Sequence, residues 1–549
     1  MPCRAVDADA CRQLTAAMPV ACMYVAMQDD DLFEQCDALG IMVLPGICCC
    51  DAWQSWDVWT DATHKLAAES LRSQVKRLRR FPSMTTFLYS SDQLPPPEVE
   101  QSYIDVFQTE RWQTGLISTA SYLNSTLTGV SGVKMAGPYG WVPPNYWYTD
   151  TDEERVGTAF GFATEISPGA APLTLDSMEK TVPADQLWDP KSEYGGPTED
   201  WNYHCGAAVG AFGSLTHFQP GMTHRYGNAT SAAEYLAKAQ LEAYESHRAM
   251  FEAYSRNKYN STGLIQWMLQ SAWPSNMWHL YDYYYQIGGS GFGAKKACSP
   301  EVHLLYSYPS QADNDHESSN GHVWAVNSRY TPSAAGLVAT ATEYDLNGKV
   351  MQTKKTSLDE PLAPDGVKRL MALDLYSDLQ PARTTTILVR LRLSSGSGEV
   401  IEDNWYWLPP KLDKFEMGGC FTGCKVDNFA NMRDLPSMPA SPKLSVSLGD
   451  PTPSDEDSSL VTHTVQLKAE AKDGSGDTKW LAFFVRLRAL DADGNDVLPA
   501  TWSDNFVSLQ AGESVVLVLG HEADATVAKV VATAFNSPAT AHSEAGGRY

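Results

Sequence analysis

The 549-residue sequence contains no apolar run approaching the ~18 residues that a membrane-spanning helix needs. Nothing in it therefore predicts insertion into a bilayer. Basic residues are scarce, because 41 Lys and Arg stand against 66 Asp and Glu, a formal net charge of −25. This charge disfavours nucleic acid as a partner and would attract a polycationic ligand. Acidity alone also fits an ordinary soluble protein, so the charge narrows the choice of partner without naming it.

Paired cysteine motifs are also missing. The eleven cysteines show no zinc-ribbon spacing, and the adjacent Cys48, Cys49 and Cys50 are poorly spaced for a metal cage. We therefore expect no metal site and no cofactor. Cys420 and Cys424 are close enough along the chain for a local disulfide.

The first 31 residues do not form a clean signal peptide, since Asp7 and Asp9 come early and the apolar stretch after Met18 is short. Glycosylation sequons nevertheless suggest a secretory route. They begin at Asn124, Asn228 and Asn260. We expect the full-length protein to be extracellular, directed by a signal that is not visible in this chain.

The character of the chain changes near residue 315. Before it, short apolar runs alternate with amphipathic stretches such as Thr60–Leu78 and Ser231–Tyr259, an order typical of parallel sheets. After it, short alternating segments follow one another without a long helix, which is typical of β-sandwiches. We expect a multidomain protein with a (β/α)8 barrel of the TIM type over 1–315 and two immunoglobulin-like sandwiches over 316–415 and 440–549.

Two apolar runs of the first region each end on a carboxylate. The stretch "FGFATEI" carries Glu165 near its end. The stretch "FLYSSD" ends in Asp92, and three prolines follow that stop the strand. Chemistry in parallel α/β barrels lies at the carboxyl ends of the strands, and two carboxylates there are the minimum for cleaving a glycosidic bond. The alternatives are that Asp92 caps the following helix and that Glu165 pairs with a basic residue.

Six segments of the first region resemble glycoside hydrolase family two, in its exo-β-D-glucosaminidase or exochitosanase branch. They are "GIMVLPGICCCDAWQSW", "FLYSSDQLPPPEVE", "SGVKMAGPYGWVPPNYWY", "AFGFATEISPG", "WNYHCG" and the long stretch from "GLIQWMLQSAWPSNMWHLYDYYYQIGG" onward. The resemblance runs over about residues 29–549 and includes "NWYWLP" and "AFFVRLRALDADGNDVLPATWSDN" in the sandwiches. It implies a barrel and immunoglobulin-like domains, and hydrolysis with retention of configuration.

The resemblance also implies roles for the carboxylates, because the family's acid/base follows strand four and its nucleophile follows strand seven. Counting back from strand eight assigns strands seven to three to these runs: "AFGFATE" (159–165), "AGPYGWV" (136–142), "GLISTAS" (115–121), "TTFLYSSD" (85–92) and "GIMVLPG" (40–46). Asp92 then resembles the acid/base and Glu165 the nucleophile. Mannosidase and galactosidase branches place Asn-Glu where this chain has Ser91-Asp92, which favours a glucosaminidase.

Further site residues follow from the same resemblance. Trp267 in "IQWMLQ" would form an apolar floor under the sugar, or else be a core Trp, and His204 would contact substrate or satisfy a backbone group. The motif "GPYGWVPPNYW" would lie at the barrel mouth or serve loop packing. Its members are Tyr139, Trp141, Asn145, Tyr146 and Trp147. We expect Cys48, Cys49 and Cys50 to pack beneath the site.

The start of the chain departs from the family. Residues 1–28 lack the family's "RLEG"-type stretch, and no first barrel strand or preceding jelly-roll domain is visible. We expect Val20–Met27 or "GIMVLPG" to be an unpaired barrel edge, and a longer chain to be needed for activity. The predicted function is a monomeric, retaining exo-β-D-glucosaminidase that releases glucosamine from chitosan. The alternatives are an inactive fragment that binds polysaccharide and a β-mannosidase-type enzyme.

Overall fold

The computed structural model describes most of the chain and divides it into two compact units. The described residues are 20–23, 29–47, 51–149, 158–192, 195–205, 215–299, 302–310, 321–376, 383–454, 459–471, 479–537 and 540–542. Unit 1 comprises Met1–Gly137, Thr151–Ile166 and Asn257–Trp267. Unit 2 comprises Pro138–Asp150, Ser167–Arg256 and Met268–Tyr549. The expected domain boundaries do not follow this division and stay predictions.

Unit 1 is built on short parallel strands. They are β1 (Val20–Met23), β2 (Met42–Pro45), β3 (Thr86–Leu88), β4 (Gly115–Ile117), β7 (Gly161–Ile166) and β8 (Ser261–Gln266). Parallel ladders join β1 to β2, β3 to β4 and β7 to β8. Isolated parallel bridges connect Val43 to Met84 and Gly46 to Leu88, so the first four strands follow one another in space as they do in sequence. Parallel neighbours need helical crossovers, and the sequence supplies them.

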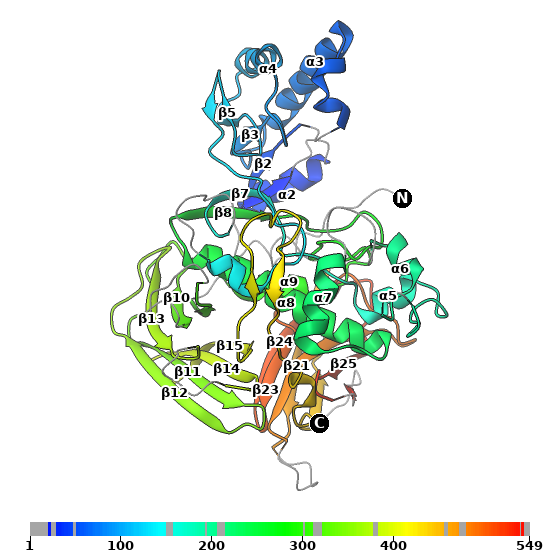
Figure 1. Ribbon diagram of the computed structural model, residues 1–549, viewed down its shortest axis with the longest axis vertical. Helices are drawn as coiled ribbons and strands as arrows, with labels where there is room; N and C mark the ends of the chain where they lie inside the picture. The colour runs from blue at the N-terminus through cyan, green and yellow to red at the C-terminus, as the bar shows by residue number, and fades with distance from the viewer. Residues whose placement is uncertain are drawn as a thin grey trace. The chain divides into compact units, whose positions relative to one another are not determined.

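The helices of unit 1 cover these strands (Figure 1). They are α2 (Asp30–Leu39), α3 (Asp61–Leu78) and α4 (Pro97–Thr109), with the 3-10 turns η1 (Asp51–Trp53) and η2 (Trp56–Val58). Thr60 begins α3 in a capping box with Thr63, which satisfies helix-end N–H groups. Apolar residues of all three α-helices, such as Phe33, Leu71 and Phe107, share one buried core with Phe87 of β3. The expected helix over Thr60–Leu78 is therefore confirmed.

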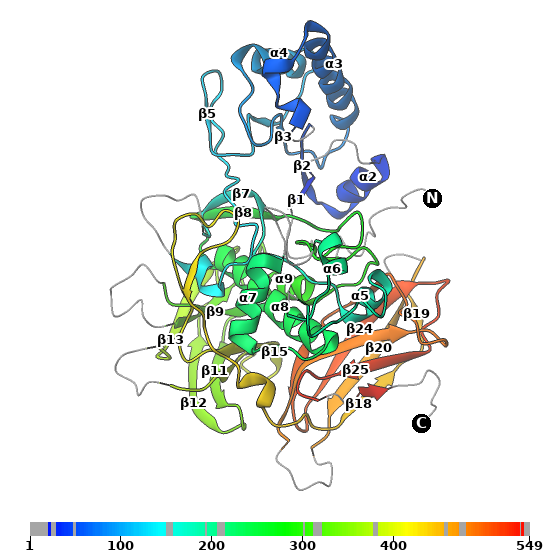
Figure 2. The ribbon, with the colours of Figure 1, turned by 45° about the vertical axis from the view of Figure 1, so that its right-hand side comes forward.

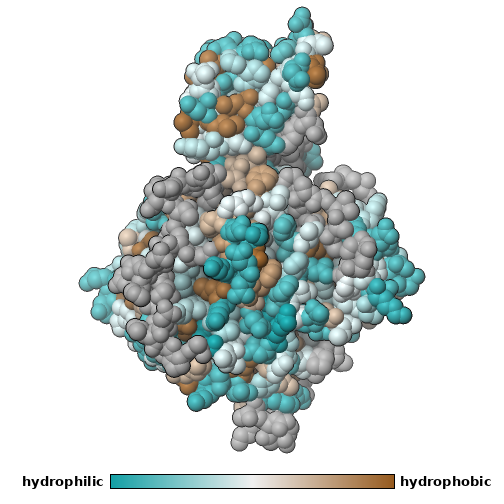
Figure 3. All heavy atoms as spheres, viewed as in Figure 1, coloured by the Kyte–Doolittle hydropathy of each residue, from teal (hydrophilic) through white to brown (hydrophobic). Residues whose placement is uncertain are grey.

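A buried carboxylate fixes the loop that follows β4. Glu100 of α4, only 2% exposed, accepts hydrogen bonds from the hydroxyls of Tyr89, Ser125 and Thr128, at 2.7 Å or slightly more. Ser125 lies in the small hairpin of β5 (Asn124–Ser125) and β6 (Gly129–Val130). Large apolar side chains around this hairpin, including Val130, are exposed, and hydrophobic surface is visible on this unit in Figure 3. Polar contacts to Glu100 therefore anchor the hairpin where apolar packing is sparse.

Two strand expectations for this region fail in part. Residues 136–142 form no strand, and the place beside β7 is taken by Lys134, which makes a parallel bridge to Ala163. The segment after Lys134 leaves the sheet because Pro138 lacks a backbone donor, and Tyr139 gives its N–H to the carbonyl of Phe421 instead. "GIMVLPG" is not an edge, since β2 pairs on both sides. Among the described strands β1 has a ladder only with β2, and the rest of Val20–Met27 lies outside the described residues.

Unit 2 begins with helices and a long aromatic-rich turn. They are η3 (Pro144–Tyr148), α5 (Leu175–Thr181), α6 (Glu199–Tyr203), α7 (Leu215–Tyr226), α8 (Ala232–Arg256) and α9 (Gly289–Ala297). The 25-residue α8 confirms the helix expected over Ser231–Tyr259, and from Tyr235 to Tyr254 it is almost wholly buried. A helix that is apolar or buried all round belongs to a core rather than to a surface. Here α8 is the central element of unit 2.

The first β-sandwich packs a three-stranded sheet, in the order β13-β10-β9, and a four-stranded sheet, in the order β12-β11-β14-β15. Its strands are β9 (His303–Ser307), β10 (Gly321–Val326), β11 (Leu337–Asp345), β12 (Val350–Leu358), β13 (Val367–Leu373), β14 (Ile387–Ser394) and β15 (Val400–Leu408). All pairings are antiparallel. Strand β9 precedes residue 316 and still pairs with β10.

A second sandwich follows the small hairpin of β16 (Lys414–Phe415) and β17 (Val426–Asn428) and the turn η4 (Leu435–Ser437). Its sheets run β18-β20-β24-β22, with β19 beside β20, and β23-β21-β25-β26. The strands are β18 (Leu444–Leu448), β19 (Thr452–Pro453), β20 (Leu460–Ala469), β21 (Leu481–Leu490), β22 (Ala500–Trp502), β23 (Val507–Gln510), β24 (Ser514–Glu522), β25 (Lys529–Thr533) and β26 (Thr540–His542). The expected disulfide between Cys420 and Cys424 is confirmed.

Helix α8 contacts both sandwiches, and Figures 1 and 2 show α8 and α9 between them. Arg248 donates to the Trp405 carbonyl of β15 at 2.6 Å, while the Tyr244 ring meets Phe484 of β21 edge-on with centroids 5.3 Å apart. Polar and aromatic contacts from one buried helix thus join the two sandwiches into a single unit.

Candidate active site

Asp92 lies in the loop after β3, where backbone hydrogen bonds fix its position. With the Gln54 amide oriented so that its oxygen faces the loop, that oxygen accepts from the backbone N–H groups of Ser91 and Asp92 at 3.1 and 3.0 Å. The Ser91 hydroxyl donates to Asp92 Oδ1 at 2.8 Å. The Asp92 side chain is exposed. Helix α4 has Pro96 at its N-cap, so the alternative reading of Asp92 as a helix cap is wrong.

Glu165 is the penultimate residue of β7. Its neighbours Thr164 and Ile166 are fully buried, whereas Glu165 is half-buried. The ladder between β7 and β8 is irregular between Ala163 and Ile166, so the strand bulges where Glu165 lies. Bulges bend a strand and re-aim a side chain, and they are common beside active sites. The local backbone therefore turns this carboxylate away from regular sheet geometry.

One short segment after β4 connects the two carboxylate residues. The backbone N–H of Ala120 donates to the Ser91 carbonyl at 2.9 Å, and the Ser121 hydroxyl donates to the Asp92 carbonyl at 3.0 Å. From the other side, the Thr164 hydroxyl donates to the Ala120 carbonyl, also at 3.0 Å. Asp92 and Thr164, the residue before Glu165, are thus each hydrogen-bonded to residues 120–121. The carboxyl ends of β3, β4 and β7 meet at this point.

The hydroxyls at this junction are enclosed. Thr119 and Thr164 have no exposed surface, and the Thr119 hydroxyl donates to the Ser91 carbonyl at 2.5 Å. Buried hydroxyls that are fully engaged hold a backbone rigidly. Sequence reasoning did not single out Thr119, Ser121 or Thr164. Their only signal is that each occurs at the end of an apolar strand run.

Lys134 is a further polar residue that sequence reasoning missed. It lies beside β7, is 5% exposed, and donates from Nζ to the Thr158 carbonyl at 3.0 Å. Burial lowers the pKa of Lys134 to about 7. An amine of that pKa is partly neutral at physiological pH. The signal in the sequence is a lone lysine inside the otherwise uncharged run "SGVKMAGPYG".

Trp267 directly follows β8 and belongs to the same neighbourhood. Its backbone N–H donates to the Ile166 carbonyl at 2.9 Å, which places it next to the residue after Glu165. The side chain is half-buried. Trp267 is therefore not a fully enclosed core residue. A partly open indole beside a strand-end carboxylate would suit a wall that faces a sugar.

Apolar side chains from these strands and from β2 form one cluster. Leu44 of β2, Leu88 of β3 and Ala120 after β4 are its buried members. Partly buried Phe162 of β7 and Ile265 of β8 pack against them. A shared cluster of this kind holds the strand ends at fixed spacing, so the positions of the two carboxylates depend on packing as well as on hydrogen bonds.

The remaining expected site residues belong to unit 2. Those of the "GPYGWVPPNYW" motif are at most 3% exposed, and they are Tyr139, Trp141, Asn145, Tyr146 and Trp147. Tyr139 packs on Phe421 with ring centroids 5.1 Å apart, and Asn145 donates to the Asp413 carbonyl at 3.0 Å. Such enclosure favours the packing interpretation of this motif. Cys48, Cys49 and Cys50 lie outside the described residues.

His204 is half-buried and bonds through Nδ1 to the carbonyl of Pro274 at 2.7 Å. Its ring also lies against Trp273, with centroids 5.2 Å apart. The interpretation that His204 satisfies a backbone group therefore describes its observed contact.

Neither a membrane span nor a metal cluster is found among the parts of the chain that the structure describes. Within those ranges no helix has the length and apolar composition that crossing a bilayer requires. No three His, Cys, Asp or Glu side chains of the described residues gather as metal ligands would.

Comparison with known proteins extends these observations. Residues 319–411 match the model of the mannosidase Ig/CBM-like domain, and residues 421–537 match that of the exo-β-D-glucosaminidase Ig-fold domain. An exo-β-D-glucosaminidase of Streptomyces avermitilis is 36% identical over 515 residues, which are 90% of this chain and 52% of that protein. One of Hypocrea jecorina is 32% identical over 90% of this chain and 54% of its own length. The chain therefore spans about half the length of these curated relatives.

A solved structure agrees. The crystal structure of the Amycolatopsis orientalis exo-chitosanase CsxA superimposes with a TM-score of 0.85 at 30% identity, over 98% of this chain and 61% of that one. Two variants of that enzyme, one with a Glu and one with an Asp replaced by alanine, have been solved in complex with PNP-β-D-glucosamine.

The two β-sandwiches are thus immunoglobulin-like, and the chain has the multidomain fold of glycoside hydrolase family two. Within that family it is similar over about nine tenths of its length to the exo-β-D-glucosaminidases, the exochitosanase branch that the sequence motifs resemble.

Proposed function

We propose that Asp92 and Glu165 are the catalytic pair of a retaining exo-β-D-glucosaminidase, carried by strands of a (β/α)8 barrel. The observation that supports this most is the hydrogen-bonded segment at residues 120–121, which ties the Asp92 loop to the strand of Glu165. The carboxyl ends of parallel strands are where barrel enzymes place their chemistry. Trp267 contributes the apolar wall of the same site.

The proposed reaction proceeds in two displacements. The Glu165 carboxylate attacks the anomeric carbon while the bond to the leaving oxygen breaks, and Asp92 gives its proton to that oxygen. Water then attacks the glycosyl-enzyme, Asp92 takes a proton from it, and the Glu165 carboxylate is released. This mechanism needs the carboxyl groups about 5–5.5 Å apart.

The proposed substrate is chitosan, cleaved at its non-reducing end. The relatives support this choice, because one is an exo-chitosanase whose variants were solved with PNP-β-D-glucosamine. The Asp and the Glu that were replaced in that enzyme are 72 positions apart in its sequence. Asp92 and Glu165 are 73 positions apart in this chain. The net charge of −25 suits a polycationic substrate. Secretion of the full-length protein, suggested by the sequons, belongs to the same proposal.

Chemical rescue tests the roles. In a form of the protein that cleaves glucosaminides, Asp92→Ala should lose activity on chitosan oligomers but retain the first step on substrates with very acidic leaving groups, which need no proton. Added azide should rescue this variant and yield a β-glycosyl azide, whereas azide with Glu165→Ala should yield the α-product. Identical products from both variants would contradict the assignment.

Substrate preference tests the class. Cleavage of glucosaminides should exceed that of N-acetylglucosaminides and mannosides, because an acidic site gains from the substrate ammonium. Faster mannoside cleavage would favour the β-mannosidase alternative. Binding of chitosan with no turnover, by this chain and by a longer one alike, would favour the inactive fragment.

A further inference from the structure

A cavity of about 520 Å³ lies inside unit 2, where the two sandwiches and the central helices meet. Its wall includes β14 and β15 of the first sandwich, residues 504–509 and 513–516 of the second, Tyr244 of α8 and Lys296 of α9. This volume falls within the range of small-molecule sites, which occur preferentially between domains. Asp92 and Glu165 belong to the other unit, so the cavity is not built from the proposed catalytic residues.

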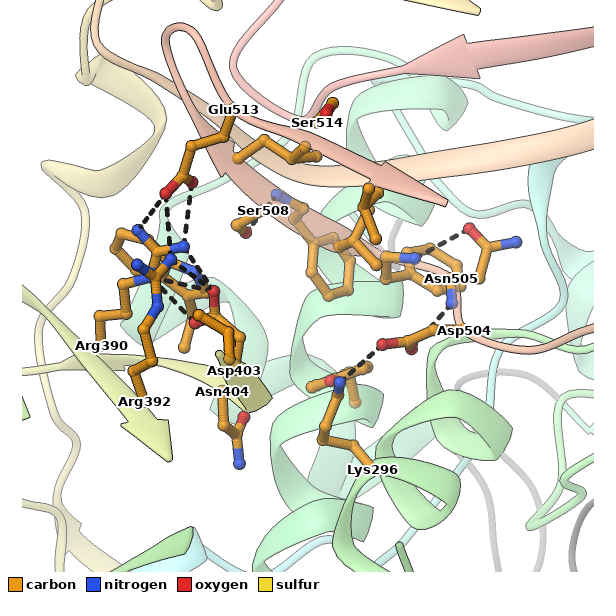
Figure 4. A pocket seen from close by; sticks show the side chains of 18 of the residues that line it. Lys296, Arg390, Arg392, Asp403, Asn404, Asp504, Asn505, Ser508, Glu513 and Ser514 are labelled. Carbon is orange, nitrogen blue, oxygen red and sulfur yellow. Dashed lines mark hydrogen bonds and ion pairs between the residues drawn. The ribbon is translucent and has the colours of Figure 1, made fainter. Parts of the chain in front are cut away.

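Polar groups line two sides of the cavity (Figure 4). On one side Arg390 donates to both oxygens of Glu513 at 2.9 Å, and Arg392 donates to Asp403 at 3.1 Å and to Glu513 at 3.0 Å. On the other side Lys296 Nζ contacts an oxygen of Asp504 at 2.6 Å.

The charges of this lining balance. Three cations face three carboxylates, and each cation is already bound to an acid. A charged ligand would have to displace a partner from one of these partly buried ion pairs, which is costly. A neutral ligand that accepts or donates hydrogen bonds at the edges of the pairs meets no such cost. The lining therefore favours an uncharged polar molecule.

Aromatic residues also line the cavity. They are Tyr244, Trp405, Trp407, Phe484 and Phe506. Tyr244 is only 4% exposed. Burial raises the pKa of Tyr244 to about 12, so this hydroxyl stays protonated and available as a donor. A purely apolar ligand would offer this hydroxyl no acceptor.

We propose that this cavity is a non-catalytic binding site for neutral sugar units of a polysaccharide. A pyranose ring has apolar faces for the aromatic wall and hydroxyls at its edge for both polar sides. This inference rests on the proposed function in one respect, because the assumption that the ligand is part of a polysaccharide comes from it. In chitosan the units that fit are the acetylated ones, which carry no ammonium. The cavity would hold the polymer at the stretches that the proposed active site cleaves least.

Calorimetric titration of the whole chain with N-acetylglucosamine tetramer tests the proposal. Val516, 60% exposed, lines the cavity, whereas Val518 lies on the same face of β24 and does not line it. Val516→Arg should weaken binding at least tenfold, and Val518→Arg, which adds the same charge, should leave it unchanged. Equal binding by the two variants, or no binding by the unaltered chain at millimolar ligand, would overturn the proposal.

A second pair of variants tests the hydroxyl. Tyr244→Phe should weaken binding of the tetramer about fivefold, since one hydrogen bond is lost. Tyr235→Phe on the same helix is the control, because Tyr235 is as buried and does not line the cavity. Glucosamine tetramer should bind no more weakly to Val516→Arg than to Val518→Arg. If only this cationic ligand lost affinity in Val516→Arg, the cavity would be a site for charged sugars and the inference would be wrong. Turnover of glucosaminides is measured separately, so failure here leaves the proposed function standing.

Discussion

The carboxylates of the proposed site in unit 1 are held differently from those around Arg225 in unit 2. In unit 1 the backbones of Asp92 and Glu165 are fixed by neighbouring hydroxyls and amides, while their side chains are exposed and half-buried. In unit 2, Glu242, Glu245 and Asp413 are fully buried and all three contact Arg225. A carboxylate that reaches the surface can meet a substrate, whereas one enclosed around a buried guanidinium is committed to stability. Exposure therefore distinguishes the two proposed catalytic carboxylates from the three that surround Arg225.

The largest expected effect contrasts function with stability. Glu165→Gln should lower turnover by more than ~10³-fold, because an amide cannot attack the anomeric carbon, and should leave the free energy of unfolding nearly unchanged. Glu245→Gln should do the reverse, because Glu245 accepts buried hydrogen bonds from Arg225 and from the hydroxyls of Tyr226 and Tyr308. Turnover and urea unfolding are measured for both variants. A large stability loss in Glu165→Gln would place Glu165 in the structural class.

Removing the shared cation of unit 2 should be the next largest effect. Arg225→Met leaves three buried carboxyl groups without a positive partner, and breaking a buried pair in this way costs about 3–5 kcal/mol. Chemical denaturation followed by the tryptophans of unit 2 measures the loss. Lys425→Ala is the control, since the exposed pair of Lys425 with Glu416 should contribute nothing measurable. A similar loss in both variants would show that burial does not determine the difference.

Unit 2 should also lose stability in acid through its buried histidines. Desolvation lowers the pKa of His247 to about 4 and that of His279 to about 3. Both histidines stay neutral in the folded state, whereas in the unfolded state they take up a proton below about pH 6.5. The stability that they contribute to the fold is therefore fully present above about pH 6.5 and is lost as the pH falls toward their folded-state pKa values. For His247 the loss reaches up to about 3 kcal/mol.

His247→Gln provides the measurement, because Gln does not titrate in this range. The difference in unfolding free energy between the unaltered chain and this variant should shrink or reverse between pH 7 and pH 4.5. Carboxylates such as Glu242, whose pKa burial raises to about 8, titrate in both proteins and cancel from the difference. A difference that is independent of pH would show that His247 does not titrate with folding.

Local pattern in the sequence was enough to predict much of this fold. Periodicity and capping predict α3 and α8, and apolar runs ending in Asp92 and Glu165 predict β3 and β7. Alternation predicts the central strands of both sandwiches. Edge strand β12 gives no such signal, because most of its residues are exposed and no buried face marks it.

Contacts between distant segments could not be predicted. Residues 136–142 look like a strand because the run is apolar, but their backbone is satisfied elsewhere, as the bond from Tyr139 to Phe421 shows. The hydroxyls of Thr119 and Thr164 look like any polar residue at a strand end until the strands are placed side by side. The cavity of unit 2 combines Tyr244, Arg390 and Glu513, which no local window contains.

The smallest expected effect concerns the junction at residues 120–121. Thr164→Val keeps the shape of the side chain but removes the hydroxyl, whose single proton is shared between the carbonyls of Ala120 and Lys134. The Ala120 carbonyl loses this donor, whereas the Lys134 carbonyl keeps the backbone N–H of Thr164, so the change should cost about 1–2 kcal/mol of stability. Because Thr164 touches no reacting atom in the proposed mechanism, it is a positioning residue, and its loss should lower kcat more than it raises KM. Thr164→Ser, which restores the donor, should recover most of kcat. If Thr164→Val changed stability alone and left kcat intact, the hydrogen-bonded segment would support the fold without setting the geometry of Asp92 and Glu165.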